Sequence, residues 1–137
     1  MSGVWRRFWR AMELLTRLPG PPLGLGSADE MAGAVPLYPV VGAVIGGLLA
    51  VASWLAGLLL PVVVVASILV PLSVLLTGAL HEDGLADSAD GIGAGANRER
   101  ALRVMRDHSN GTYGGVALIS AFAIRVGCWV ALGDLDG

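Results

Sequence analysis

Long apolar runs separated by short polar stretches dominate the hydrophobic pattern of this chain. The longest run covers residues 31–80 and contains no charged residue. A helix needs roughly 20 apolar residues to cross a bilayer, so this run is long enough for two spans, which we place at residues 35–60 and 62–80. A third apolar run predicts a span at residues 116–132. The pattern therefore predicts an all-α integral membrane protein with about three transmembrane helices.

An amphipathic helix is predicted before the first span. Residues 4–18 repeat apolar side chains at helical spacing, and the arginines lie mainly off that face. The apolar face carries Trp5, Trp9, Met12 and Leu15. A basic helix with tryptophan often lies in the membrane interface, which is the interpretation we favour; the alternative is a helix packed on its own domain. Residues 19–30 are rich in proline and glycine, which indicates a linker, so residues 1–30 form an interfacial helix and linker.

The composition narrows the class of protein further. Hydrophobic residues make up 55% of the 137 residues and charged residues 15%, whereas soluble domains have about 25% charged residues. This argues against a soluble domain, and we expect one membrane domain over residues 1–137 in contact with the lipid bilayer. The net charge is −2, and no nucleic-acid partner is expected. The single cysteine, Cys128, has no partner for an internal disulfide.

The distribution of arginine predicts the topology. One cluster lies between residues 6 and 17, before the first span, and another between residues 98 and 106, after the second span. Two crossings place both clusters on one side of the membrane, and the positive-inside tendency makes that side the cytoplasm. We therefore expect a multi-pass protein of the inner membrane in which residues 81–115 form a cytoplasmic catalytic block.

The acidic segment after the second predicted span carries the clearest chemistry. Residues 81–91 read HEDGLADSADG, with five acidic or imidazole side chains. At about 100° per residue, Asp83, Asp87 and Asp90 share one helical stripe, where three carboxylates repel each other unless a cation lies among them. Such hard oxygen ligands suit Mg²⁺, Mn²⁺ or Ca²⁺. The stripe predicts a metal site; the alternative is a solvated helix end whose acids only mark the membrane interface.

Other polar residues are candidates for the same site. Glu82 lies off the stripe in a regular helix, but a kink at Gly84 would bring it to the metal, and it is also a candidate general base. Arg106 is a donor suited to phosphate. The opposite wall is predicted from the polar segment before the third span, whose candidate residues are Asp107, Thr112 and Tyr113.

Arg125 lies about two and a half turns into the third predicted span. An arginine at that depth is costly and usually faces protein or a polar cavity, which makes it a candidate substrate contact. The alternative is a side chain that extends to the membrane interface.

The acidic segment also resembles a known family. The string TGALHEDGLADSADG at residues 77–91 looks like the signature of cobalamin-5′-phosphate synthase (adenosylcobinamide-GDP ribazoletransferase). Its flanks agree in order: LLTRLPGP at residues 14–21, PLYPVVG at residues 36–42 and the MRD…GTYG element at residues 105–114. The metal logic is similar to that of the CDP-alcohol phosphotransferases, but this chain has Asp87 where those enzymes have arginine. The resemblance to the B12 family is therefore the closer one.

The resemblance implies a Mg²⁺-dependent phosphotransferase. The implied reaction transfers the cobinamide phosphate of adenosylcobinamide-GDP to a ribose hydroxyl of α-ribazole or its 5′-phosphate and releases GMP. In that reaction we expect Asp83, Asp87 and Asp90 to ligate the metal. Glu82 would assist the metal or accept the proton, and Asp107 would support the site. The candidate substrate contacts are Arg106, Thr112, Tyr113 and Arg125.

Two departures from the family pattern affect these expectations. Ser109 stands where the family usually has arginine, which predicts weaker phosphate binding. Family members also continue through further membrane helices after the third span, so this chain resembles the N-terminal part alone. We expect it to be inactive by itself, or to work with a second copy or the missing carboxy-terminal half. The alternatives are a lipid phosphotransferase of the CDP-alcohol type and an inactive truncated membrane fragment.

Overall fold

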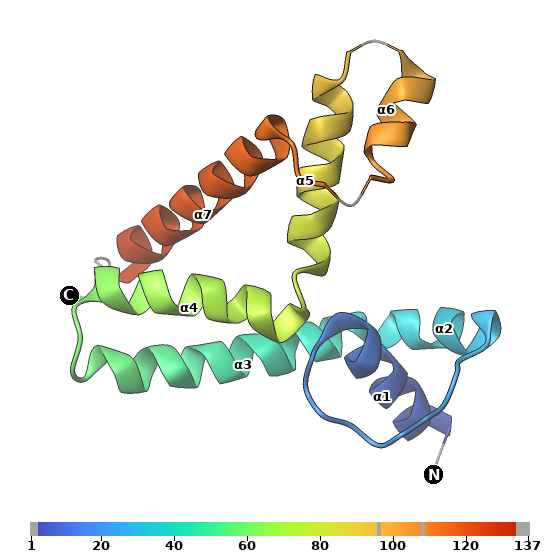
Figure 1. Cartoon of the computed structure of the whole chain (residues 1–137). Coiled ribbons are helices and arrows are strands. Elements are labelled where there is room, and N and C mark those ends of the chain that lie inside the picture. The colour runs from blue at the N-terminus through green and yellow to red at the C-terminus, as the bar shows by residue number, and fades with distance from the viewer. Residues whose placement is uncertain (1–2, 96, 108, 134–137) are drawn as a thin grey trace.

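The computed structural model describes residues 3–95, 97–107 and 109–133, and this part of the chain is built of helices joined by turns and, over residues 16–27, by a long loop (Figure 1). In chain order they are α1 (Gly3–Leu15), α2 (Ala28–Ala34), the 3-10 turn η1 (Val35–Leu37), α3 (Tyr38–Gly57), α4 (Val62–Thr77), α5 (Leu80–Gly93), α6 (Arg98–Val104) and α7 (Thr112–Gly133). No strand occurs in these ranges. The all-α prediction is therefore confirmed.

Two helical segments are long and apolar enough to cross a membrane. The first runs from Ala28 to Gly57 and joins α2, η1 and α3 into 30 residues, and the second is α7, with 22 residues. The α4–α5 pair makes a third if it is counted as one span, but its two helices meet at 92°. The chain is therefore an all-helical membrane protein with two or three candidate spans among its described residues, in agreement with the apolar pattern.

The second apolar run does not form one continuous helix. The pattern predicts a span over residues 62–80, whereas α4 stops at Thr77 and α5 starts at Leu80. Gly78 and Ala79 have φ values of 68° and 60°, and a left-handed residue of this kind commonly ends a helix. Apolar composition does not encode this turn, because Leu80 is as hydrophobic as the residues before it.

The apolar face of α1 packs against the beginning of the first span. A small core is buried there, and its members are Ala11, Met12, Ala34 and Val41. Trp9 and Leu15 pack against this core, while Trp5 remains half exposed. Most of the apolar face of α1 therefore packs on its own chain, which is the second of the two interpretations of residues 4–18. A location of α1 in the membrane interface stays a prediction.

Arg10 ties the segment between α1 and α2 to α1. Its side chain is 2% exposed, and its guanidinium donates to the carbonyl oxygens of Leu23 and Gly24 at 3.0 and 2.6 Å. It also donates to the carboxylates of Glu13 and Glu30 at 2.9 and 3.2 Å. Because four acceptors converge on one buried guanidinium, the segment predicted to be a linker is fixed to the protein.

The predicted linker also extends too far, since α2 begins at Ala28 rather than after Glu30. The Ser27 hydroxyl caps α2 by accepting the Glu30 N–H at 3.2 Å. Serine followed three residues later by glutamate is the pattern of a helix capping box. The proline- and glycine-rich composition before it obscured this signal.

We predict that Arg10→Met loosens the amino-terminal unit. The substitution keeps an unbranched apolar stem but removes the hydrogen bonds of Arg10 to two carbonyl oxygens, to Glu13 and to Oε2 of Glu30. A hydrogen bond to a charged group contributes roughly 1.5–3 kcal/mol, and we expect a local loss of about 2 kcal/mol, measured by amide hydrogen exchange across residues 18–27. Arg6→Met is the matched control, because Arg6 binds the same Glu30 from a half-exposed position. Equal exchange in the two variants would contradict the prediction.

Candidate active site

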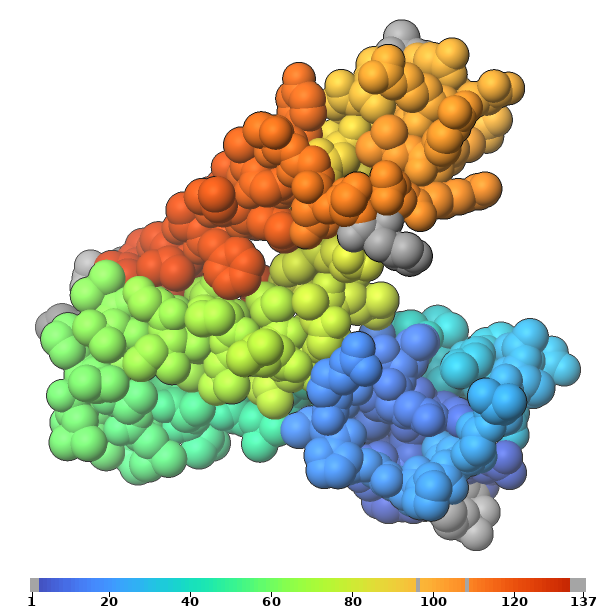
Figure 2. Space-filling model, viewed as in Figure 1, coloured from blue at the N-terminus to red at the C-terminus, as the bar shows by residue number. Residues whose placement is uncertain are grey.

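The turn between α4 and α5 places the acidic segment. Gly78 ends α4 in the left-handed conformation and its N–H donates to the Leu75 carbonyl oxygen at 3.2 Å. Glycine suits this position because its φ is positive and because the Arg17 side chain packs where a Cβ would lie. As a result α5 leaves α4 at 92°. In Figure 2 the yellow and orange atoms of α5 and α6 project away from the green body of α3 and α4.

The described residues between 94 and 111, which include α6, form an arm that folds back along α5 (Figure 1). Two glycines of α5 allow the close approach. A Cβ at Gly91 would collide with Met105 of the arm, and a Cβ at Gly93 would collide with Tyr113 at the start of α7. The end of the arm is therefore held against the same helix that carries the acidic segment.

A pocket of about 190 Å³ lies between α5 and the arm and collects several of the predicted residues. Its lining is Asp83, Asp87, Met105, Arg106, Asp107 and Asn110. Asp83 and Asp87 are about one helical turn apart on α5, and Asp107 comes from the arm. Three carboxylates and a guanidinium therefore meet around one space. Such a set of groups is suited to hold a hard cation beside a phosphate.

Met105 and Asn110 are lining residues that the sequence did not single out. Both lie in the MRD…GTYG element at residues 105–114, in which the sequence indicated Arg106, Asp107, Thr112 and Tyr113 instead. Their only signal was this position, because neither a thioether nor an amide indicates a site by residue type alone.

Asp90 does not line this pocket, although it shares a helical stripe with Asp83 and Asp87. Its side chain is buried, and its two carboxylate oxygens accept the N–H groups of Gly111 at 2.7 Å and Gly114 at 2.8 Å. Helical angle alone could not reveal these partners, which lie on another segment.

The acidic side chains of α5 fit Mg²⁺ as a pair and not as a cluster of four. Within the described ranges, no three or more histidine, cysteine, aspartate and glutamate side chains are arranged to hold a metal ion. The predicted ligand set of Glu82, Asp83, Asp87 and Asp90 is thus not gathered into one cluster. Mg²⁺ commonly uses one or two protein carboxylates and completes its shell with water and substrate phosphates, so the pair Asp83 and Asp87 fits the ion. The metal itself stays a prediction.

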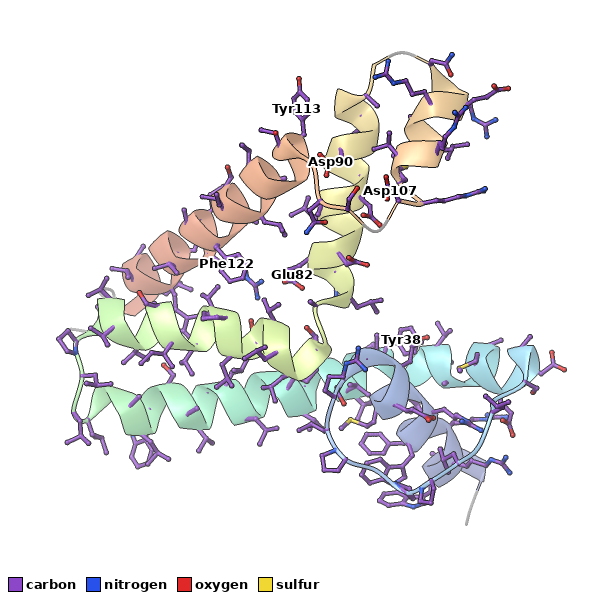
Figure 3. The ribbon with its side chains drawn as sticks, viewed as in Figure 1. Tyr38, Glu82, Asp90, Asp107, Tyr113 and Phe122 are labelled. Carbon is purple, nitrogen blue, oxygen red and sulfur yellow. The ribbon has the colours of Figure 1, made fainter. Side chains whose placement is uncertain are left out.

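Glu82 is paired with Arg125. Its Oε1 accepts from Arg125 Nη1 at 2.8 Å, and Arg125 Nη2 donates to Ser73 Oγ at 2.7 Å. Figure 3 shows Glu82 in the space between α5 and α7, on the other side of α5 from Asp107. Arg125 therefore faces protein, as its depth in the third span led us to expect. The metal-binding and general-base roles of Glu82 stay predictions.

A cavity of about 490 Å³ borders this ion pair. Its lining comes from four helices, α3, α4, α5 and α7, and includes Ile45, Ser73, Glu82 and Arg125. The Oε2 atom of Glu82 is buried and has no hydrogen-bond partner among the described residues. The Glu82 carboxylate consequently depends on Arg125 for its stabilisation.

Thr112 and Tyr113 line a third pocket, of about 300 Å³, which Asp90 and Asp107 also border. Tyr113 is 63% exposed, and in Figure 3 it points outward from the start of α7. The four predicted substrate contacts therefore lie at three different places in the structure. Thr112 and Tyr113 share a pocket that adjoins Asp107, Arg106 lies with the acidic pair, and Arg125 lies apart from both.

The comparison with known families agrees with this arrangement. A family model described as cobalamin-5-phosphate synthase matches residues 7–135. The chain belongs to this family. The match extends from α1 through α7, so the acidic helix, the arm and the three apolar runs all lie within the cobalamin-5-phosphate synthase region. The resemblance recognised from residues 77–91 is confirmed.

Curated relatives carry the name adenosylcobinamide-GDP ribazoletransferase. The protein from Leptothrix cholodnii is 38% identical over 132 residues, which are 96% of this chain and 50% of that protein. One from Rhizobium etli is 46% identical over 125 residues, or 90% of this chain and 48% of that protein. The chain thus spans about half the length of the curated relatives it matches. No solved structure matches it.

We predict that the Glu82–Arg125 pair stabilises the junction of α4, α5 and α7. Arg125→Met should lower the melting temperature in detergent, because it leaves a carboxylate without its cation in a partly apolar cavity. Glu82→Gln should restore part of the loss when it is combined with Arg125→Met, and groups in contact usually show coupling of about 0.5–3 kcal/mol. Thermal unfolding followed by tryptophan fluorescence measures the cycle. Strictly additive losses would show that the pair contributes nothing.

Proposed function

We propose that the pocket between α5 and the arm is part of the active site of an adenosylcobinamide-GDP ribazoletransferase. A ribose hydroxyl of α-ribazole or its 5′-phosphate attacks the phosphorus that carries the cobinamide. The bond from this phosphorus to the oxygen of the GMP portion breaks, a new P–O bond forms, the hydroxyl proton is lost and GMP leaves. The observation that carries the proposal is the meeting of Asp83, Asp87, Asp107 and Arg106 in a chain of this family.

The pyrophosphate of the substrate determines what the pocket has to do. Asp83 and Asp87 would hold Mg²⁺, which supplies charge neutralisation to the phosphate oxygens when it is bound. Arg106 offers a planar set of donors that suits phosphate oxygens. Phosphoryl transfer depends mostly on positioning and electrostatic stabilisation, so a pocket with few reactive groups is sufficient.

Asp107 is the better candidate to accept the hydroxyl proton. It is exposed at the pocket between α5 and the arm and also borders the pocket of Thr112 and Tyr113. Glu82, the other carboxylate considered for this role, is already bound by Arg125. Glu82 also does not line the pocket between α5 and the arm, and it lies on the other side of α5 from Asp107 (Figure 3).

The same proposal includes the cellular setting. The arm and α1 face the cytoplasm, and the chain crosses the inner membrane more than once. Support comes from the arginines of both segments, since arginine favours cytoplasmic loops. A second copy of the chain or a carboxy-terminal half would complete the enzyme, because the curated relatives are about twice as long.

Topology can be tested by thiol labelling in a Cys128→Ser background. Ser2→Cys and Ser109→Cys should both resist a membrane-impermeant maleimide in intact cells and react after lysis. This result is expected because the two arginine-rich segments lie on one side of the membrane. Labelling of one site in intact cells with protection of the other would contradict it.

The transfer reaction is tested by Asp83→Asn and Asp87→Asn in a chain co-expressed with the carboxy-terminal half of a full-length relative. Each substitution should abolish Mg²⁺-dependent GMP release from adenosylcobinamide-GDP, because a bound metal supplies several kcal/mol of transition-state stabilisation. Asp29→Asn is the matched control, since Asp29 is an exposed carboxylate in the first turn of α2.

Two outcomes would contradict the proposed function. One is near-normal turnover by Asp83→Asn or Asp87→Asn. The other is transfer that requires CDP-diacylglycerol in place of adenosylcobinamide-GDP, which would indicate a lipid phosphotransferase.

A further inference from the structure

We infer that Asp90 is a positioning residue that latches the arm and the start of α7 onto α5, and that it is not a metal ligand. This inference deepens the proposed function, on which its catalytic consequence rests. The latch itself consists of contacts within the fold and can be tested without any transfer reaction.

The first argument is that both carboxylate oxygens of Asp90 accept backbone hydrogen bonds from the segment around the start of α7. Oδ2 accepts the Gly111 N–H at 2.7 Å and Oδ1 accepts the Gly114 N–H at 2.8 Å, and the residue is only 8% exposed. These N–H groups belong to the residue before α7 and to its first turn, where backbone donors have no partner inside the helix. Turning the carboxylate toward a metal would leave two such donors unsatisfied.

The second argument is that the chain around the carboxylate leaves no space for other residues. A Cβ at Gly111 would lie 2.5 Å from Asp90 Oδ1, and a Cβ at Gly114 would collide with Asp90 Oδ2 and lie 3.0 Å from the Ala86 carbonyl oxygen. Both donors are thus glycines at positions where a side chain would displace the carboxylate. The two glycines therefore provide the space that the Asp90 carboxylate fills.

The third argument is the place of the latch in the site. Asp107 and Asn110, which line the pocket between α5 and the arm, lie between α6 and Gly111 in the sequence. Next to Asp90 in the last turn of α5, packing of Met105 against Gly91 and of Tyr113 against Gly93 supports the same closure. Because Asp90 fixes the backbone next to Asn110, it sets the distance between Asp107 on the arm and the pair Asp83 and Asp87 on α5.

The three aspartates of this helical stripe therefore have two different roles in the metal site. Asp83 and Asp87 supply the ligands, and Asp90, on the same stripe, holds the opposite wall in place. Substitution of Asp90 should therefore weaken metal binding indirectly, through the loss of a closed pocket.

The decisive experiment compares amide hydrogen exchange in metal-free protein purified in detergent. Asp90→Asn retains one acceptor oxygen but presents an NH₂ group to the second donor, so residues 109–115 should exchange about tenfold faster or more, as expected when a hydrogen bond to a charged acceptor is lost. Gly114→Ala should increase exchange in the same segment, because it displaces the carboxylate while Asp90 is still present. Asp87→Asn is the matched control and should leave exchange there unchanged.

Binding of Mn²⁺, followed by its electron paramagnetic resonance signal, completes the test. Asp87→Asn should abolish binding, whereas Gly114→Ala should weaken it about as much as Asp90→Asn does. The inference is overturned if Asp90→Asn leaves metal-free exchange at residues 109–115 unchanged and loses Mn²⁺ binding as Asp87→Asn does. That outcome would return Asp90 to the ligand set and leave the proposed transfer reaction standing.

Discussion

The pair of left-handed residues at Gly78 and Ala79 is the constraint on which the site depends. An apolar helix that continued straight through position 80 would carry its acidic residues along its own axis. The turn sends α5 off at 92° instead. The segment that follows α1 supports it, because the Arg17 N–H donates to the Leu76 carbonyl oxygen at 2.7 Å. Every later contact of the site, including the arm against α5, is formed on a helix whose direction this turn sets.

One short helix then separates two kinds of electrostatic environment. Neighbouring residues of a helix point about 100° apart, so Glu82 and Asp83 face different partners although they are adjacent. Glu82 meets Arg125 and the cavity between α3, α4, α5 and α7. Asp83 meets the pocket beside the arm. The ion pair joins α5 to α7, while the carboxylates on the other side line the pocket together with Arg106.

The features that could be predicted from the sequence are those that depend on composition and local periodicity. The three apolar runs became α3, α4 and α7, and Arg125 faces protein because a charge at that depth needs a partner. The turn after Thr77 and the partners of Asp90 were missed for a different reason. Each depends on backbone conformation or on a contact with a distant segment, and a helical angle or an apolar average contains neither.

The hydrogen bonds made by Arg10, Asp90 and Arg125 differ in the number of residues that separate the two partners in the sequence. The partners of Arg10 lie 3 to 20 residues away, so the α1–α2 unit can close while the later spans are still being made. The partners of Asp90 lie 21 and 24 residues later in the sequence. Those of Arg125 lie 43 and 52 residues earlier. Contacts across longer loops carry a larger entropic cost and form more slowly. We therefore expect the α1–α2 unit to fold first during synthesis. The pocket between α5 and the arm closes later, when the start of α7 binds Asp90.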